Sequence, residues 1–340
     1  MAFQFSSLKH VLDTLDGLNP LGVSEIAEIL GKSTVIVHKY VKELVNQGKL
    51  KKVGIGPKTK YILVSLNSGK NTVLKKGDSE IIEISFSDKK LLDEIFLKYD
   101  ADGKILKGYT GILKWCKDRN LDPKEKITSY LNIHHYIEKI HDNCGLIDAG
   151  DAFGKDFDEV FLDNVYYADQ YKWMDFGRGK LAEMTFYGKQ SQNKTLILES
   201  IDEVYYRIEC LIQKESYSAI AITPWSIERK NQFLKILKNK LTPLGVPFVQ
   251  MVKYYPNAIA IPQKTLKTRE QRILNAKNTI FVDDPLVEKY KKVLLIDDFV
   301  GSGSTLNETA KKLKEGGVKI VDAFAFVGNT NLNYEVINEI

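Results

Sequence analysis

The sequence predicts an α/β protein with a mostly parallel sheet, preceded by a small helical domain and a mainly helical connector. Two observations lead to this expectation. The apolar runs 293–296 and 318–327 have the character of buried parallel strands, and a helical pattern at 306–316 lies between them. The excess positive charge lies near the amino terminus, which sets that part of the chain apart. We therefore expect three parts, at residues 1–66, 67–154 and 155–340.

The 340 residues have an ordinary globular composition, with 44% hydrophobic and 27% charged side chains. These values exclude a collagen-like, wholly disordered or disulfide-scaffold protein. No apolar run approaches the ~18 residues needed to cross a bilayer, and the amino terminus lacks the layout of a secretory signal. Cys116, Cys144 and Cys210 are odd in number and far apart, so no zinc-type or redox pair is expected. A cytoplasmic location is the resulting expectation.

The net charge of +5 is concentrated in the first fifth of the chain. Residues 1–70 hold ten lysines against five acids, whereas the rest of the chain balances at 39 basic and 39 acidic side chains. Such asymmetry is typical of a module that contacts a polyanion.

Three helices are expected in the first domain. Helical spacing of leucine and valine predicts one over residues 8–15. A second helix begins at a Ser24 cap and ends at Gly31, and a third begins at a Ser33 or Thr34 cap. Two strands are then predicted by the alternating residues that follow, with a glycine-rich turn between them. These strands and the turn lie at 49–53, 60–64 and 54–59.

This order of elements resembles a winged helix-turn-helix. In that family the third helix enters a major groove of DNA and the wing contacts phosphate or the minor groove. The resemblance therefore implies that this domain binds double-stranded DNA, although such domains also serve in dimerisation or protein docking. The module has no arginine, so phosphate contact by lysine is expected to dominate over bidentate reading of guanine. The expected DNA-binding residues are Ser33, Thr34, His38, Lys39, Lys42, Lys51, Lys52, Lys58 and Lys60.

The connector carries no recognisable chemistry. Residues 65–80 are polar and glycine-bearing, as in a linker, and residues 81–86 have a β-like pattern. Helices are predicted at 91–99, 111–118 and 127–140. A cluster of possible metal ligands lacks a complete set, so a packed or solvated helix is favoured over a metal site. These residues are His134, His135, His141 and Cys144.

The strongest signal is a strand, two acids, a small-residue loop and a helix. Asp297 and Asp298 follow the strand at 293–296, and the loop at 301–305 precedes the helix. Glycines let backbone N–H groups approach an anion, while hydroxyls and the helix start add donors and a positive dipole end. The acids would repel a phosphate in contact with them, so they suit the hydroxyls of an attached sugar. Together these features predict a ribose 5-phosphate site at the carboxyl end of a parallel strand.

This segment resembles the phosphoribosyl-pyrophosphate (PRPP) motif of type I phosphoribosyltransferases. The resemblance implies a phosphoribosyltransferase fold, with the 5′-phosphate on Gly301, Ser302, Gly303, Ser304 and Thr305. It also implies that Asp297 and Asp298 hold the ribose and stabilise positive charge that develops on it.

Residues upstream extend the resemblance. The apolar run 217–225 predicts a buried strand whose turn receives the pyrophosphate in this family, and a helix at 230–241 and a strand at 248–252 follow. The segment 263–275 is similar to the mobile loop of the ComF-type branch, and 181–189 resembles another run of that branch. ComF-type zinc-finger cysteines are absent, and cations after the pyrophosphate turn are few. The expected pyrophosphate-binding residues are Thr223, Pro224, Trp225 and Lys253, and the catalytic cations of the loop are Arg269 and Arg272.

The resemblance implies a cytoplasmic enzyme that uses Mg²⁺, bound through PRPP rather than directly by the protein, to transfer ribose 5-phosphate to or from a nitrogenous base or amine. Two alternatives stay open. The chain could sense PRPP and regulate transcription without catalysis, or the basic domain could hold an enzyme on nucleic acid. The basic segment at 263–272 favours catalysis. A homodimer is a further possibility for this family.

Overall fold

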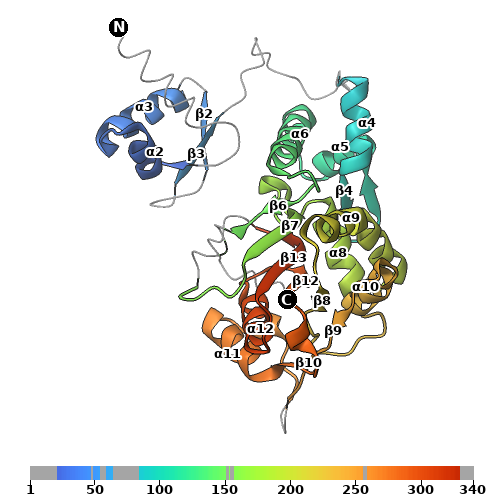
Figure 1. Ribbon diagram of the computed structural model, residues 1–340. Coiled ribbons are helices and arrows are strands. Elements are labelled where there is room, and N and C mark those ends of the chain that lie inside the picture. Colours follow the sequence, from blue (N-terminus) through green and yellow to red (C-terminus); the bar gives the residue numbers. More distant parts are fainter. Residues whose placement is uncertain are drawn as a thin grey trace. The chain divides into compact units, whose positions relative to one another are not determined.

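The computed structural model describes residues 21–46, 49–53, 59–63, 84–150, 153, 157–255 and 259–329, with the backbone alone at residues 29, 53, 62, 63 and 264. Contacts divide the chain into two compact units, Met1–Glu83 and Ile84–Ile340 (Figure 1). No described helix is long and apolar enough to cross a membrane.

The first unit is a small helical domain with a three-stranded sheet of order β1-β3-β2. Its elements are β1 (Leu21–Gly22), α2 (Val23–Leu30), α3 (Thr34–Asn46), β2 (Leu50–Val53) and β3 (Lys60–Leu63). The predicted ribbon is confirmed, since β2 and β3 pair antiparallel with Leu50 opposite Leu63. The predicted third helix is also confirmed as α3, in which Val37, Val41 and Leu44 are buried in the core of the unit.

Two details of this unit concern the helix caps. The prediction that Ser24 caps the second helix is wrong, since α2 already includes Val23 and Ser24. Gly22 is the cap, and its N–H donates to Glu25 Oε2 at 2.6 Å. Ser33 Oγ accepts from Ile36 N at 3.5 Å, in agreement with a cap before α3. The predicted helix at 8–15 and most of the turn at 54–59 lie outside the described residues.

The second unit is built on a six-stranded sheet of order β6-β7-β13-β12-β8-β9. All neighbouring pairs in it are parallel except β6 with β7, which confirms the predicted mostly parallel α/β sheet. The strands of this sheet are β6 (Ile147–Asp148), β7 (Asn164–Gln170), β8 (Ala219–Ile222), β9 (Phe248–Val249), β12 (Lys292–Phe299) and β13 (Ile320–Gly328).

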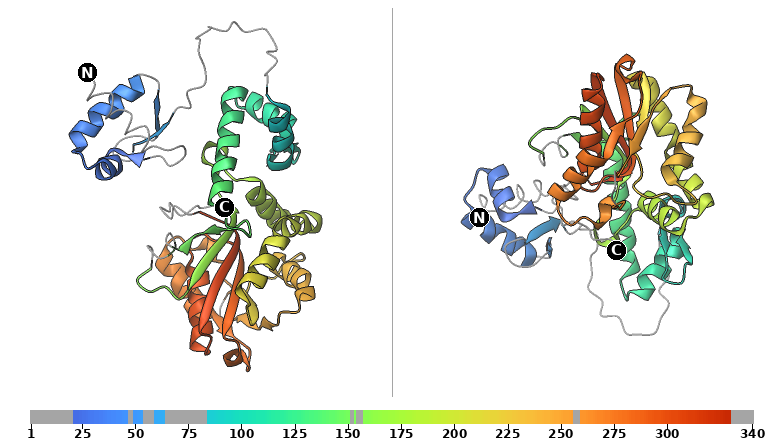
Figure 2. Two further views of the ribbon diagram at one scale, coloured as in Figure 1. Left: turned by 45° about the horizontal axis from the view of Figure 1, so that its top comes forward. Right: turned by 90° about the horizontal axis from the view of Figure 1, so that it is seen from below.

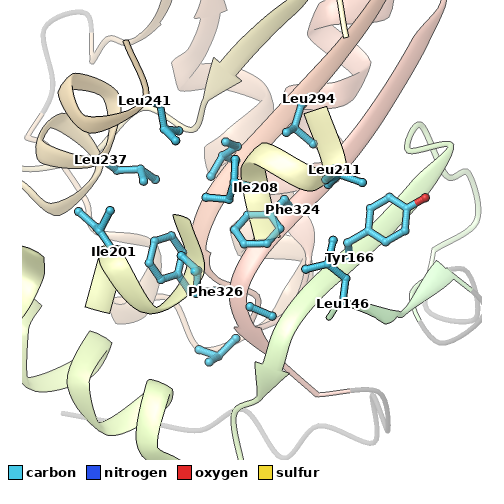
Figure 3. Close-up of a cluster of buried hydrophobic side chains, with 14 of the residues drawn as sticks. Leu146, Tyr166, Ile201, Ile208, Leu211, Leu237, Leu241, Leu294, Phe324 and Phe326 are labelled. Atoms are coloured by element: carbon cyan, nitrogen blue, oxygen red, sulfur yellow. The ribbon is translucent and has the colours of Figure 1, made fainter. Parts of the chain in front are cut away.

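Helices cover both faces of this sheet (Figure 2). One face carries α8 (Lys180–Ser191), α9 (Lys194–Glu215) and α10 (Phe233–Leu241), and the other carries α12 (Ser304–Glu315). The core against α9 and α10 includes Leu294, Phe324 and Phe326 of the central strands (Figure 3). Because alternate strand residues face opposite sides, Val293 and Leu295 are buried toward α12.

The helical region after the linker packs within the second unit. It consists of α4 (Phe86–Ile95), β4 (Leu97–Tyr99), β5 (Ile105–Lys107), α5 (Gly108–Asp118) and α6 (Pro123–Ile140). The last two confirm predicted helices. The β-like reading of 81–86 is wrong at its described end, because Ser85 caps α4 by accepting from Asp88 N. The predicted helix at 91–99 is partly wrong, since residues 97–99 form a hairpin strand with β5.

The remaining elements form a small subdomain beside the sheet. It contains β10 (Met251–Lys253) paired antiparallel with β11 (Ile280–Val282), and α11 (Arg269–Thr279) between them. The prediction of a loop over 263–275 is therefore wrong for its second half, which is helical. Thr268 caps α11 and Gln271 returns a hydrogen bond, so the chain has a local reason to coil there. Short 3₁₀ turns lie at Met174–Phe176, Thr242–Leu244, Gln263–Thr265 and Val287–Lys289.

One covalent feature differs from expectation. Cys144 and Cys210 form a disulfide that joins the turn before β6 to α9, so the expectation that the cysteines would not pair is wrong. The 66-residue separation hid this pairing, since nothing in the sequence places the two residues together. Cys144 is thereby removed as a metal ligand, and His134 and His135 each lie 3.4 Å from Glu138 on the same helix. Cys116 is a buried free thiol.

Candidate functional site

A cavity of about 320 Å³ lies at the carboxyl ends of β8, β12 and β13. It brings together residues from strands that are more than 70 positions apart in the chain. The residues predicted from sequence to bind ribose, phosphate or pyrophosphate all line this cavity, with the exception of Arg269. They are Thr223, Pro224, Trp225, Lys253, Arg272, Asp297, Asp298, Gly301, Ser302, Gly303, Ser304 and Thr305.

The small-residue loop forms the start of α12. Gly303 has φ of +73°, a left-handed conformation that glycine adopts without strain, and its N-terminal position exposes the first N–H groups of a 12-residue helix. A Cβ at Gly303 would lie 2.5 Å from Phe153 Cε2, so no larger residue fits. Ser302 Oγ and Ser304 Oγ lie 3.0 Å apart. Backbone donors, two hydroxyls and the helix dipole therefore converge on one anion-sized position.

The two acids occupy the carboxyl end of β12, where the sequence predicts the sugar-binding acids. Asp298 is 3% exposed, and its carboxylate forms an ion pair with Lys189 of α8. Asp297 Oδ1 accepts from Asp298 N at 2.8 Å. Burial, with a further contribution from Asp298, raises the pKa of Asp297 to about 7, although Lys189 and a hydrogen bond from Thr223 act in the opposite direction. Adjacent carboxylates thus differ in environment.

The turn after β8 forms the neighbouring wall. Thr223 N and Thr223 Oγ1 both approach Ile296 O, at 3.0 and 3.3 Å, which fixes the turn to β12. Lys253 enters the cavity from β10. Burial lowers its pKa to about 8, and the Coulomb attraction of Asp297 only partly offsets this effect. Lys253 is therefore a cation whose charge the site can lose close to neutral pH.

The segment predicted as a basic loop contributes Arg272 to the cavity. Its Nε donates to Leu266 O at 3.0 Å, and Gln263 Nε2 donates to the backbone carbonyl of Arg272 at 3.0 Å, so one bond holds the side chain and the other holds its backbone. Burial lowers the pKa of Arg272. Arg269 instead lies with its guanidinium 5.3 Å from the Phe157 ring centre and does not line the cavity.

Several lining residues were not predicted as part of the site. Lys189 is the most consequential because it contacts Asp298 directly. The sequence of residues 181–189 shows only a resemblance to a run of the ComF-type branch. No local pattern shows that α8 reaches the end of β12. Tyr171 stacks near Phe299, with ring centres 4.5 Å apart. The other lining residues of α8 and the turn are Ala182, Thr185, Phe186, Gln190, Ser226, Ile227, Arg229 and Gln232.

The donor set fits a magnesium ion held mainly by a ligand. Among the described residues, no group of three or more histidine, cysteine, aspartate or glutamate side chains could hold a metal ion. Asp297 and Asp298 nevertheless present carboxylates to the cavity. Mg²⁺ usually takes one or two carboxylates together with phosphate oxygens of the substrate, and this cavity offers that arrangement.

The predicted DNA-binding residues lie in the first unit. Ser33, Thr34, His38, Lys39 and Lys42 are exposed on or before α3, opposite its buried stripe. Lys51 and Lys52 are exposed on β2, and Lys60 lies 3.5 Å from Glu25. Lys58 lies outside the described part of the chain.

Comparison with known proteins agrees with the chemistry of the cavity. Residues 231–337 match the phosphoribosyl transferase domain family. Over 51 residues the chain is 45% identical to an adenine phosphoribosyltransferase of Treponema denticola. That stretch covers 15% of this chain and only 27% of the relative's own length. The match to the family includes β12, the small-residue loop and α12, which hold Asp297, Asp298 and the anion site. The carboxyl-terminal part of this chain is therefore similar to a phosphoribosyl transferase domain over residues 231–337.

Proposed function

We propose that this protein catalyses Mg²⁺-dependent transfer of ribose 5-phosphate between PRPP and a nitrogenous base or amine. The observation that supports this most directly is one cavity that joins a helix-terminal anion site, two carboxylates and four flanking cations. A ribose 5-phosphate with a pyrophosphate at C1 matches each of these features. Its phosphate suits the anion site, its hydroxyls suit the carboxylates and its pyrophosphate suits the cations.

In the proposed complex, the loop 301–305 binds the 5′-phosphate through backbone N–H groups and the serine and threonine hydroxyls. Asp297 and Asp298 accept hydrogen bonds from the ribose hydroxyls. The pyrophosphate lies against the turn Thr223, Pro224 and Trp225, where Lys253 and Arg272 offset its charge. Mg²⁺ would be held by pyrophosphate and ribose oxygens with Asp297 nearby, and when bound it neutralises the leaving group.

The reaction forms a bond from the acceptor nitrogen to C1 as the bond from C1 to the pyrophosphate oxygen breaks. The electron pair leaves with pyrophosphate, and the proton of the nitrogen passes to water. Because C1 gains positive charge in the transition state, the nearby carboxylates stabilise it more than they stabilise the bound substrate. Arg272, whose side chain donates to Leu266 O and whose carbonyl accepts from Gln263, positions positive charge where negative charge develops.

The test combines binding and turnover. Calorimetry with PRPP and Mg²⁺ should show binding by the wild type and a large loss for Asp297→Asn/Asp298→Asn. Pyrophosphate release is then measured over a panel of bases and amines. Release that depends on one acceptor identifies the reaction. Binding without release from any acceptor would instead favour a PRPP sensor, an alternative that the likeness to an enzyme does not favour.

We further propose that the first unit binds double-stranded DNA as a winged helix-turn-helix. The supporting observation is the exposed face of α3, where Val35 is 78% exposed and Ile36 44% exposed beside Lys39 and Lys42. Apolar side chains beside lysines on an uncovered helix suit thymine methyl groups flanked by phosphates. The nearby strand β2 adds Lys51 and Lys52.

Duplex binding by the full chain should weaken steeply with salt, because each lysine–phosphate contact releases counterions. Lys39→Glu/Lys42→Glu should reduce affinity at least tenfold in low salt, whereas Lys194→Glu, an exposed lysine in the second unit, should not. A flat salt response would refute DNA binding. A cytoplasmic location is likewise our proposal, and the Cys144–Cys210 disulfide is the structural feature that bears against it.

A further inference from the structure

Lys189 lies outside the matched domain, yet it contacts the centre of the cavity. It is near the end of α8, 109 residues before its partner Asp298, and its ammonium forms an ion pair with the Asp298 carboxylate of β12. The exposed fractions of the two side chains are 37% for Lys189 and 5% for Asp298. The carboxylate is therefore almost closed to water, while the ammonium remains open to the cavity.

Hydrogen bonds to the backbone carbonyl of Lys189 fix the position of this residue. The carbonyl of Lys189 accepts from Arg229 Nη1 at 2.8 Å and from Gln192 Nε2 at 2.9 Å. Gln192 in turn accepts two hydrogen bonds from Asn231, one from the backbone N–H and one from Nδ2. The end of α8 is thus attached to the segment that follows the turn 223–226, and the helix cannot move away from β12 without breaking these bonds.

The other end of α8 is held by a buried ion pair. Glu183 Oε1 lies 3.1 Å from Lys98 Nζ, and both side chains are less than one-tenth exposed. Arg178 Nε approaches the second oxygen of Glu183 at 3.5 Å. The helix is therefore anchored at two points, with Lys189 facing the acids of β12.

We propose that Lys189 is a positioning residue for the ribose site, which holds the Asp298 carboxylate oriented to accept a ribose hydroxyl. A carboxylate has two oxygens and about four acceptor sites, so Asp298 can keep the ammonium of Lys189 and still accept from a ligand. Without that cation, the buried carboxylate would lose its ion-pair partner and the contact that fixes its orientation. This inference rests on the proposed function, because it assumes that a ribose phosphate is the ligand.

Four other charged side chains line the cavity, and they are Asp297 of β12, Lys253 of β10, Arg229 after β8 and Arg272 of α11. The contact between Lys189 and Asp298 is direct, so the loss of the ammonium should act first on the Asp298 carboxylate. Arginine at position 189 should therefore rescue binding, whereas a purely packing role would not distinguish a cation from a neutral side chain.

The experiment measures ribose 5-phosphate binding to the full chain by calorimetry at one fixed pH. Lys189→Met should raise Kd about tenfold, in line with a lost hydrogen bond to a charged group. Lys189→Arg should retain most of the affinity. Lys194→Met, which removes an exposed lysine five residues away, serves as the matched control and should bind as the wild type.

A double-mutant cycle tests the route of the effect. In the Asp298→Asn background, Lys189→Met should change Kd by less than threefold, because its partner carboxylate is gone. An unchanged Kd for Lys189→Met would overturn the inference. Tighter binding by that variant would also overturn it, since Lys189 would then obstruct the ligand. If wild type itself binds no ribose 5-phosphate or PRPP, the proposed function fails first, so the two failures are distinguishable.

Discussion

Asp297 and Lys253 face one cavity with pKa values that burial moves toward neutrality, to about 7 and about 8. Asp297 must be ionised to accept a hydrogen bond through both oxygens, whereas Lys253 must be protonated to attract pyrophosphate. Ribose 5-phosphate affinity should therefore rise as pH increases through 7, and pyrophosphate affinity should fall above pH 8. Calorimetry with each ligand across this range measures both arms.

Variants assign each arm to its residue. Asp297→Asn should flatten the low-pH arm for ribose 5-phosphate, and Lys253→Met should flatten the high-pH arm for pyrophosphate. The same acid affects stability with a defined sign. Its pKa near 3.8 in the unfolded chain is raised by folding, so the folded protein binds more protons between pH 4 and 7. The contribution of Asp297 to stability therefore decreases as pH rises through that interval, and Asp297→Asn should remove this dependence.

At the scale of single elements, the pair Lys98–Glu183 joins β4 to α8 inside the second unit. Burial lowers the pKa of Lys98, while the charge of Glu183 opposes that effect. Lys98→Met leaves a buried carboxylate without this partner and should cost about 3–5 kcal/mol of unfolding free energy. The double variant Lys98→Met/Glu183→Leu should recover most of the loss in urea denaturation. If Lys98→Met were as stable as the wild type, the Lys98–Glu183 pair would contribute little to the free energy of unfolding.

Elements whose information is local were predictable from the sequence. The strand–acids–loop–helix unit at 292–315 is contiguous, so its aliphatic run, glycines and hydroxyls suffice to define it. The ribbon of the first unit follows from alternation in the same way. The error at α11 was avoidable, because Thr268 and Gln271 stand at capping-box spacing, and Ser85 with Asp88 marks the start of α4 in the same manner.

Features made by distant residues were not predictable. The Lys189–Asp298 pair joins two elements that become neighbours only after the sheet has formed. The same holds for Lys98 with Glu183 and for Cys144 with Cys210. In each case the residue type is common and the neighbouring sequence does not indicate the contact. The contact depends on how α8 and α9 pack on β12 and β13. The lining residues of β12 and of the loop 301–305 were thus predicted, whereas those of α8 were not.

At the scale of the whole molecule, the Cys144–Cys210 disulfide closes a 66-residue loop that contains β7, α8 and most of α9. The chain-entropy account of such a loop gives about 4 kcal/mol of stabilisation. Reduction, or Cys144→Ser/Cys210→Ser, should lower the unfolding free energy by up to that amount in urea denaturation. Reductant should have no further effect on the double variant, which serves as the control. Three titratable thiols in the unreduced, denatured protein would contradict the pairing.

The sheet order has a consequence for any attempt to work with the recognisable segment alone. In the sheet, β8 lies between β12 and β9, yet β8 ends at Ile222 and the matched segment begins at residue 231. A polypeptide cut at that boundary would keep both outer neighbours and lose the strand that joins them, along with β7 and α8. Its backbone donors and acceptors would face a gap in the middle of the sheet. The matched segment is therefore not expected to fold by itself, and gene fusions or truncations that respect folding must begin upstream of β7.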